Sequence, residues 1–205
     1  MASAAPINLS KGERINLSKA QPGLKEIRIG LKWLLKPGQT ADLDASVVLL
    51  GADDKMVKGG EPNTPRGLCY YTNPSLPGIE HKGDAKFGGD GEADNETIII
   101  KLDEVASDAQ ALLIVCTSYN PEVETNPNCA PILFGQVAKP KITIYNNTNG
   151  EALYTFELDE DASAVTAAEL GRLYRKDGDW RFTGLGEGHG KAPNGLANII
   201  SKWYE

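Results

Sequence analysis

The sequence contains little of what several classes of protein require. Its 205 residues include three cysteines, Cys69, Cys116 and Cys129, and this odd, irregularly spaced set indicates neither a disulfide framework nor a zinc site. No apolar run has the length of a membrane span, and residues 1–10 lack the pattern of a secretory signal. The formal net charge of -7 argues against nucleic-acid binding, which needs clustered Lys and Arg. We therefore expect a globular protein of the cytoplasm.

Helical periodicity is also scarce, whereas short β-type segments recur between turns. The expected strands lie around Ile27–Trp33, Val47–Leu50, Leu68–Tyr71, Thr97–Ile100, Leu112–Cys116, Lys141–Tyr145, Ala152–Phe156, Leu170–Tyr174 and Trp180–Thr183. Many short strands with little helix predict an all-β protein, a β-sandwich of two mostly antiparallel sheets. No break in composition divides the chain, so we expect one domain over residues 1–205, with its core at about 7–190.

Turn signals predict three hairpins. Residues 146–150 and 176–179 are rich in Asn, Asp and Gly and each joins two expected strands. The repeat INLSK at 7–11 and 15–19 flanks Gly12 and predicts a third hairpin. The short helix expected within 191–205 has one apolar face, formed by Leu196, Ile199, Ile200 and Trp203. That face either packs on its own sandwich or binds a partner.

Two groups of acidic residues stand directly before apolar strands. The larger group, Asp84, Asp90, Glu92, Asp94 and Glu96, is interspersed with glycines. Calcium takes six to eight oxygen ligands from carboxylates and carbonyls, and glycine lets a loop curl around an ion. The smaller group is Asp42 and Asp44, whose side chains would point to one side of a strand. These residues indicate a calcium site unlike an EF-hand, and a solvated acidic turn is the alternative.

Catalytic motifs are weak by comparison. His81 lies beside the acidic loop and is either a base, a metal ligand or an ordinary loop residue. The glycines of 184–190 superficially suggest a phosphate loop, but the Lys-Ser/Thr pair is missing. We therefore favour a non-enzymatic binding protein. A metal-dependent hydrolase or a small-ligand binding module using the same acidic loops remains the alternative.

Several segments stand in a characteristic order along the chain: Leu17-Ser-Lys19, Pro22-Gly-Leu24, Gly30-Leu-Lys-Trp33, Asp42-Leu-Asp-Ala-Ser46, Tyr70-Tyr71, His81-Lys-Gly-Asp84, Gly89-Asp-Gly-Glu-Ala-Asp-Asn-Glu96, Phe134-Gly-Gln-Val137, Leu158-Asp-Glu-Asp161, Gly171-Arg-Leu-Tyr174 and Trp180-Arg-Phe182. Together they resemble the TerD-like proteins of bacterial tellurite-resistance and stress operons. They extend over residues 7–190, and the two acidic motifs in this order are specific.

The resemblance implies a β-sandwich that binds one or two calcium ions at one end. By position, the implied ligands are Asp42, Asp44, Asp84, Asp90, Glu92, Asp94 and Glu96. It also implies partners among the proteins of a stress-response complex, including a membrane-associated one. Ala85 and Phe87 depart from the family's usual Asn and Thr, and Ala93 and Asn95 from its usual Gly and Asp. These departures predict that one ion site is weakened or lost.

Overall fold

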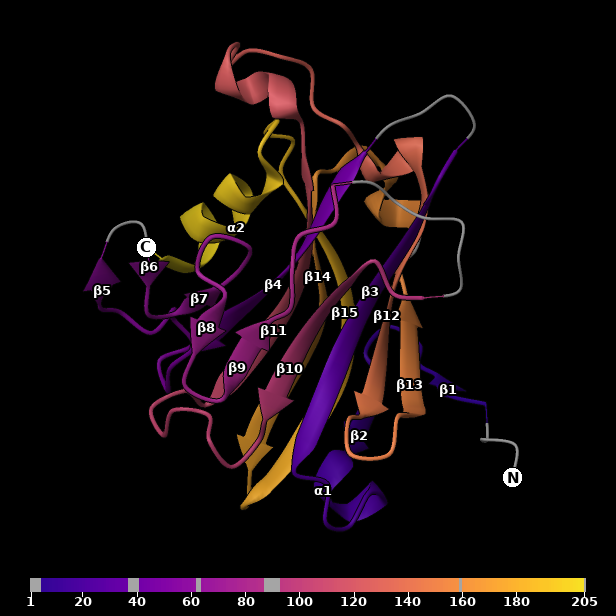
Figure 1. Ribbon diagram of the computed structural model, residues 1–205, viewed down its shortest axis with the longest axis vertical. Coiled ribbons are helices and arrows are strands. Elements are labelled where there is room, and N and C mark those ends of the chain that lie inside the picture. Colours follow the sequence, from indigo (N-terminus) through magenta and orange to yellow (C-terminus); the bar gives the residue numbers. More distant parts are fainter. Residues whose placement is uncertain (1–4, 37–40, 62–63, 87–92, 159, 205) are drawn as a thin grey trace.

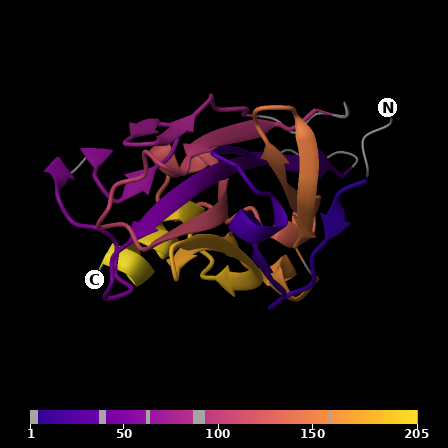
Figure 2. The same cartoon turned by 90° about the horizontal axis from the view of Figure 1, so that it is seen from below.

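The computed structural model describes residues 5–36, 41–61, 64–86, 93–158 and 160–204 (Figure 1). Two β-sheets lie one over the other with the main hydrophobic core between them (Figure 2). This arrangement confirms the predicted β-sandwich. The acidic residues Asp42 and Asp44 lie where β4 begins, toward the upper end of the sandwich in Figure 1, and residues 93–96 lead into β10.

Sheet A contains seven strands in the described chain, in the order β1-β13-β12-β3-β10-β9-β8. In that order the strands are Ile7–Asn8, Glu151–Glu157, Val137–Asn146, Glu26–Leu35, Glu96–Lys101, Ile79–His81 and Ser75–Leu76. Neighbouring strands are antiparallel, except that β1 runs parallel to β13. The predicted hairpin at 146–150 joins β12 to β13 and is confirmed.

Sheet B contains six strands in the same described ranges, in the order β2-β15-β14-β11-β4-β7. In that order they are Arg14–Asn16, Asp179–His189, Ala167–Lys176, Ala111–Tyr119, Asp42–Leu50 and Leu68–Cys69. All of these pairs are antiparallel. The hairpin predicted at 176–179 joins β14 to β15 and is also confirmed.

Alternation along the strands creates the core. In β3 the side chains of Ile27, Ile29, Leu31 and Trp33 are buried between the sheets, while the residues between them face outward. In β4 the odd-numbered residues 43–49 join this core. Val48 and Leu50 point to the opposite face, where they belong to a second apolar cluster. Helix α2 covers that cluster, and this explains why the end of β4 is a continuous apolar run.

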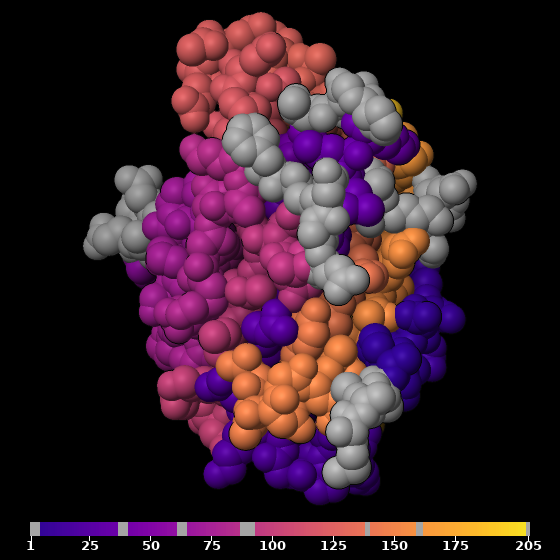
Figure 3. All heavy atoms as spheres, turned by 45° about the vertical axis from the view of Figure 1, so that its right-hand side comes forward, coloured from indigo at the N-terminus to yellow at the C-terminus, as the bar shows by residue number. Residues whose placement is uncertain are grey.

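Helix α2, Gly195–Tyr204, packs on the outer face of sheet B. Leu196 and Ile199 are buried there, whereas Ile200 is exposed. The predicted helix is confirmed, and of its two possible roles it packs on its own sandwich. Among the described residues, shorter helical segments are α1 at Leu17–Ala20 and three 3-10 turns, η1 at Pro121–Glu124, η2 at Phe134–Gln136 and η3 at Glu160–Ala164. The segment with η1 projects at the top of the molecule (Figure 3).

The hairpin predicted for the INLSK repeat is wrong. The first copy begins with β1, which pairs with β13 of sheet A, and the second overlaps β2, which pairs with β15 of sheet B. The repeat therefore joins the two sheets, and its leucines, Leu9 and Leu17, both enter the core. Between β4 and β7, strands β5 (Gly60–Glu61) and β6 (Thr64–Pro65) pair as a small separate ribbon.

Candidate functional site

Three carboxylates from distant parts of the chain meet at the upper end of the sandwich. Asp42 and Asp44 belong to β4, and Asp84 lies in the segment that follows β9. One oxygen from each can be chosen so that all three lie within 4.8 Å of one another. The two aspartates of β4 share a face of the strand, as their spacing predicts. The structure thus brings together the two acidic motifs that the sequence separates.

Strand β7 lies at the edge of sheet B and is too short to pair with the acidic part of β4. It pairs with β4 only at Val47 and Val48, beyond the acidic part of that strand. At Ala45 the backbone N–H instead donates to the Glu96 carboxylate of sheet A, 2.7 Å away. Strand β4 is therefore joined to sheet A at its acidic end, where Asp84 also lies.

Burial and like charges act together on the two aspartates of β4. Asp44 is 5% exposed, and the pKa of its carboxyl is raised to about 8. Burial is the largest cause, and the charges of Glu96, Asp42 and Asp84 account for the rest. Burial, followed by the charges of Asp84 and Glu96, raises the pKa of Asp42 to about 6, against an opposing effect of Lys86. The cluster therefore favours the uptake of a proton or a cation.

Several buried polar atoms around the cluster have no hydrogen-bond partner within the described part of the chain. They are Asp42 Oδ1 and the hydroxyls of Ser46 and Thr117. Thr117 lies directly opposite Asp44 across the β4–β11 pair, and Ser46 is the next residue on the same face of β4. Unpaired buried polar groups are costly, so a bound ion with its water would provide missing partners.

Tyrosines also flank the cluster. Tyr119 pairs with Asp42 across β4 and β11. Burial is the main cause that raises the pKa of the Tyr71 phenol to about 12, and the charges of Asp44 and Asp84 add to it. Neither tyrosine was predicted from the sequence as a site residue, and nor were Ser46 and Thr117. Their pairing and proximity depend on the strand arrangement, although the polar end of an apolar strand is a weak signal for Thr117.

Glu96 lies next to the cluster but uses both oxygens within the protein. Oε2 accepts the Ala45 N–H at 2.7 Å, and Oε1 accepts the Ala85 N–H at 3.1 Å. Its side chain is fully buried. His81 Nε2 lies 3.4 Å from the same Oε2. The geometry fits Glu96 for holding backbone in place.

Asp94 lies in a different network, on the outer face of sheet A. Its carboxylate pairs with Arg28 at 2.6 Å and accepts the Tyr145 hydroxyl at 3.2 Å. The Arg28 guanidinium also stacks 3.7 Å above the Tyr145 ring. Gly30 makes space for this carboxylate, because a Cβ there would be 2.1 Å from Asp94 Oδ2. Asp90 and Glu92, the remaining expected ligands, lie outside the described residues.

A second group of potential ligand atoms lies beneath α2. It consists of Glu169, Glu187 and His189. The ammonium of Lys202, on α2, contacts Glu169 Oε1 at 2.7 Å, and Trp203 Nε1 donates to the same oxygen at 3.1 Å. His189 Nε2 is 2.7 Å from that oxygen as well. A cation from the chain itself therefore already neutralises this carboxylate, and the contacts attach α2 to sheet B.

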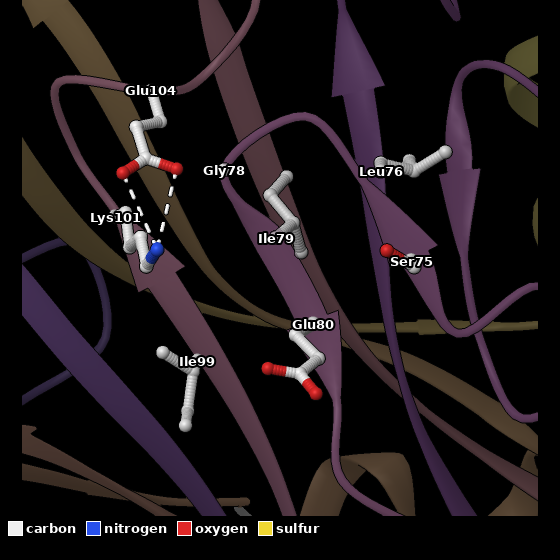
Figure 4. Close-up of a pocket in the computed structure, with 8 residues that line it drawn as sticks. All are labelled: Ser75, Leu76, Gly78, Ile79, Glu80, Ile99, Lys101 and Glu104. Atoms are coloured by element: carbon white, nitrogen blue, oxygen red, sulfur yellow. Dashed lines mark hydrogen bonds and ion pairs between the residues drawn. The ribbon is translucent and has the colours of Figure 1, made fainter.

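Two pockets lie away from the acidic end. One has a volume of about 180 Å³ and is lined by Glu80, Ile99, Lys101 and Glu104, among others (Figure 4). It lies on the outer side of sheet A near Lys101, at the other end of β10 from Glu96. The other, about 360 Å³, lies beside β1 and β13. Among the described helices, none is long and apolar enough to cross a membrane.

The fold and the site define the class of the protein: a two-sheet β-sandwich with a cluster of carboxylates where segments of both sheets meet. The chain belongs to the TerD domain family, because the model of that family matches residues 5–203. It is 34% identical to a tellurium resistance protein TerD of Serratia marcescens over 201 residues, which is 96% of each chain. It is 32% identical to general stress protein 16U of Bacillus subtilis, again with 96% of each chain covered.

A solved structure shares the fold. The crystal structure of a homologue of telluride resistance protein (TerD) from Streptomyces coelicolor A3(2) superimposes with a TM-score of 0.61 at 20% sequence identity. The match covers 83% of this chain and 94% of that chain. The family predicted from the sequence motifs is therefore confirmed, together with its association with tellurium resistance and stress response.

Proposed function

We propose that this protein is a non-enzymatic calcium-binding module of the tellurium-resistance and stress-response type. Asp42, Asp44 and Asp84 hold the ion, which orders the acidic end of the sandwich. The ordered surface then binds a protein partner in the cytoplasm, such as a component of a stress-response complex at the membrane. The names of the relatives support the stress-related role.

The observation that carries this proposal is the convergence of three carboxylates in a partly buried position. One oxygen, Asp42 Oδ1, is buried and has no hydrogen-bond partner among the described residues. Without a cation, burial and then the neighbouring carboxylates raise the pKa values of Asp42 and Asp44, which favours protonation of the calcium-free cluster. A divalent cation would satisfy all three carboxylates at neutral pH.

The donor set favours a hard cation. Carboxylate and hydroxyl oxygens surround the site, and these suit calcium or magnesium rather than a thiophilic metal. Calcium accepts irregular, many-membered oxygen shells, whereas magnesium requires a near-ideal octahedron. The three described carboxylates account for one ion. A second ion would depend on Asp90 and Glu92.

The environment of His81 argues for binding rather than catalysis. Its Nδ1 accepts the Gly83 N–H at 3.3 Å, and its Nε2 faces the Glu96 carboxylate. The ring is buried, with 1% of the side chain exposed. A general base must reach the proton of a substrate or a water. His81 is instead turned into the protein, so the hydrolase is the less favoured alternative.

The small-ligand alternative has less support from the pockets. The one in Figure 4 is rimmed by the ion pair of Lys101 with Glu104. The side chains of Lys101, Glu104 and Glu80 are each more than half exposed. A site for a small organic ligand is usually a more enclosed apolar cavity with a few placed polar groups. The acidic end is therefore the better candidate for function.

Calorimetric titration of chelator-treated protein with calcium, and with magnesium in parallel, tests the proposal. A terbium titration adds local information, because the charges of Asp44 and Asp84 act on the Tyr71 phenol and a lanthanide bound to these carboxylates would be near that ring. We expect calcium binding, stabilisation of the fold by RT ln(1 + [Ca]/Kd), and tyrosine-sensitised terbium emission that calcium displaces.

Matched variants identify the site. Asp44→Asn should abolish binding, whereas Asp103→Asn, in the exposed turn after β10, should leave it unchanged. Absence of calcium binding by the wild-type protein would refute the proposal. Equal loss of affinity in both variants would mean that only general negative charge attracts the ion.

A further inference from the structure

The backbone on both sides of Asp84 is held by buried side chains. The N–H of Gly83 donates to His81 Nδ1 at 3.3 Å, and the N–H of Ala85 donates to Glu96 Oε1 at 3.1 Å. Asp84 itself is exposed. The Asp84 side chain is therefore exposed, but the backbone N–H groups before and after it are held in place by hydrogen bonds.

The same Glu96 carboxylate also fixes the partner strand. Its other oxygen accepts the N–H of Ala45, the residue after Asp44. One buried carboxylate thus connects the peptide next to Asp84 with the peptide next to Asp44. These bonds set the spacing between the segment after β9 and strand β4, which determines the distance between the carboxylates.

His81 lies beneath the Asp84 segment. Because Nδ1 accepts a hydrogen bond from Gly83, the proton of the neutral ring is assigned to Nε2. That nitrogen lies 3.4 Å from Glu96 Oε2 but forms no hydrogen bond with the described residues, so His81 acts through Gly83. The His81 side chain is 1% exposed and that of Glu96 is 0% exposed. Both groups are held inside the sandwich, at the ends of β9 and β10, rather than in the loop.

We propose that Glu96 and His81 are positioning residues that hold Asp84 beside Asp42 and Asp44 before any ion binds, and that they act through backbone N–H groups. This inference rests on the proposed cation site. It replaces the ligand role expected for Glu96 with a supporting one and gives buried His81 a function.

The physical reason is preorganisation. Three carboxylates within 4.8 Å repel one another, and Gly83, at φ +136, places little restriction on the segment that carries Asp84. The hydrogen bonds that Ala45 and Ala85 donate to the buried Glu96 carboxylate oppose the movement of Asp84 away from the aspartates of β4. An ion that meets a prearranged site loses less affinity to ordering the loop than one that must assemble the site.

Amide exchange of the calcium-free protein is the first test. The amides of Ala45, Gly83 and Ala85 should exchange slowly in the absence of calcium. In Glu96→Gln, which keeps one carbonyl oxygen but replaces the other oxygen with an amide donor, Ala45 or Ala85 should lose protection. Asp84→Asn should lose the ion but keep the protection, because it leaves the network intact.

Calcium affinity is the second test, and His81 makes it specific. His81→Ala removes no negative charge, yet it should weaken calcium binding by about tenfold, the effect of losing the one hydrogen bond with which the ring holds the Gly83 N–H. His81→Asn, which keeps an acceptor near the position of Nδ1, should recover part of the affinity. Glu104→Gln, in the exposed turn after β10, is the charge-matched control for Glu96→Gln.

The outcomes separate this inference from the proposed function. If the wild-type protein binds no calcium, the cation site itself is wrong. If it binds calcium but the Ala85 amide exchanges freely without the ion, or if His81→Ala binds as tightly as wild type, the positioning role is wrong. If both variants unfold, amide exchange in the calcium-free wild-type protein still decides the question.

Discussion

Asp44 of β4 lies directly opposite Thr117 of β11, and the Thr117 hydroxyl is buried without a hydrogen-bond partner in the described chain. The apolar run of β11 therefore ends beside Asp44, whose pKa is raised more than that of Asp42. The pairing places an oxygen where an ion or its water could use it.

Replacement of Thr117 tests that relationship. Thr117→Val keeps the shape of the side chain and removes the unpaired hydroxyl, so we expect the calcium-free protein to gain about 1 kcal/mol in free energy of unfolding. Calcium affinity should fall, because the ion loses an oxygen in its surroundings. Urea denaturation with chelator and a calcium titration measure the two effects. A loss of stability without calcium would indicate that water already satisfies the hydroxyl.

The pH dependence of the calcium-free protein follows from the raised pKa values. A carboxyl whose pKa is higher in the folded chain binds more protons when folded, so the free energy of unfolding falls as pH rises between the two values. For Asp44 this window extends from the ordinary value of 3.8 to about 8, and for Asp42 from 3.8 to about 6. We therefore expect greater stability at pH 5.5 than at pH 8 in chelator.

Two comparisons make the pH prediction specific. Asp44→Asn should flatten the upper part of the profile, since it removes the group with the highest folded pKa. Saturating calcium should stabilise the wild-type protein more at pH 8 than at pH 5.5, because protons compete with the ion at lower pH. Chemical denaturation at both pH values provides the measurement. An unchanged profile in Asp44→Asn would mean that this carboxyl does not hold the proton.

An Asp94→Asn variant distinguishes a structural role of this carboxylate from ligation of calcium. Because its carboxylate pairs with Arg28 and Tyr145 on the outer face of sheet A, Asp94→Asn should lower the free energy of unfolding by about 1–2 kcal/mol. Calcium affinity should change little by comparison with Asp44→Asn. Denaturation and calorimetry distinguish the two effects. A loss of affinity as large as that of Asp44→Asn would show that Asp94 also ligates the ion, as the family resemblance implies.

Attachment of α2 depends on the buried Glu169. Burial raises the pKa of Glu169, but the hydrogen bonds and charges of His189 and Lys202 together outweigh burial and lower the pKa. Their contribution to stability is therefore present above the ordinary value of 4.5 and is lost as pH falls through the lower, folded value. Lys202→Met should cost about 1–3 kcal/mol by leaving Glu169 less well neutralised.

The effect should be local at first. Amide exchange in residues 195–204 should quicken in Lys202→Met before that of the sheets, because the helix also depends on the apolar contacts of Leu196 and Ile199. Ser201→Ala, on the exposed side of the helix, is the control. Equal exchange in the two variants would show that apolar packing alone holds α2.

The sequence by itself determined most of the local structure. Alternation at Ile27–Trp33 gave β3, the Asn- and Gly-rich turns gave two hairpins, and the helical spacing of Leu196, Ile199 and Trp203 gave α2. These patterns reflect burial on one face of an element, which neighbouring residues encode. The aspartates of β4 were identified for the same reason, since two-residue spacing places them on one face.

Only the tertiary structure decided which groups meet. The local pattern of the INLSK repeat predicts a hairpin, yet its two copies belong to different sheets. In this arrangement Leu9 and Leu17 are both buried in the core between the sheets, and burial of apolar side chains favours it. Glu96 and Asp94 are two residues apart in the sequence, but one lies inside the sandwich and the other outside it. Strand pairing and the packing of two sheets set those positions, and these are long-range interactions that no local pattern contains.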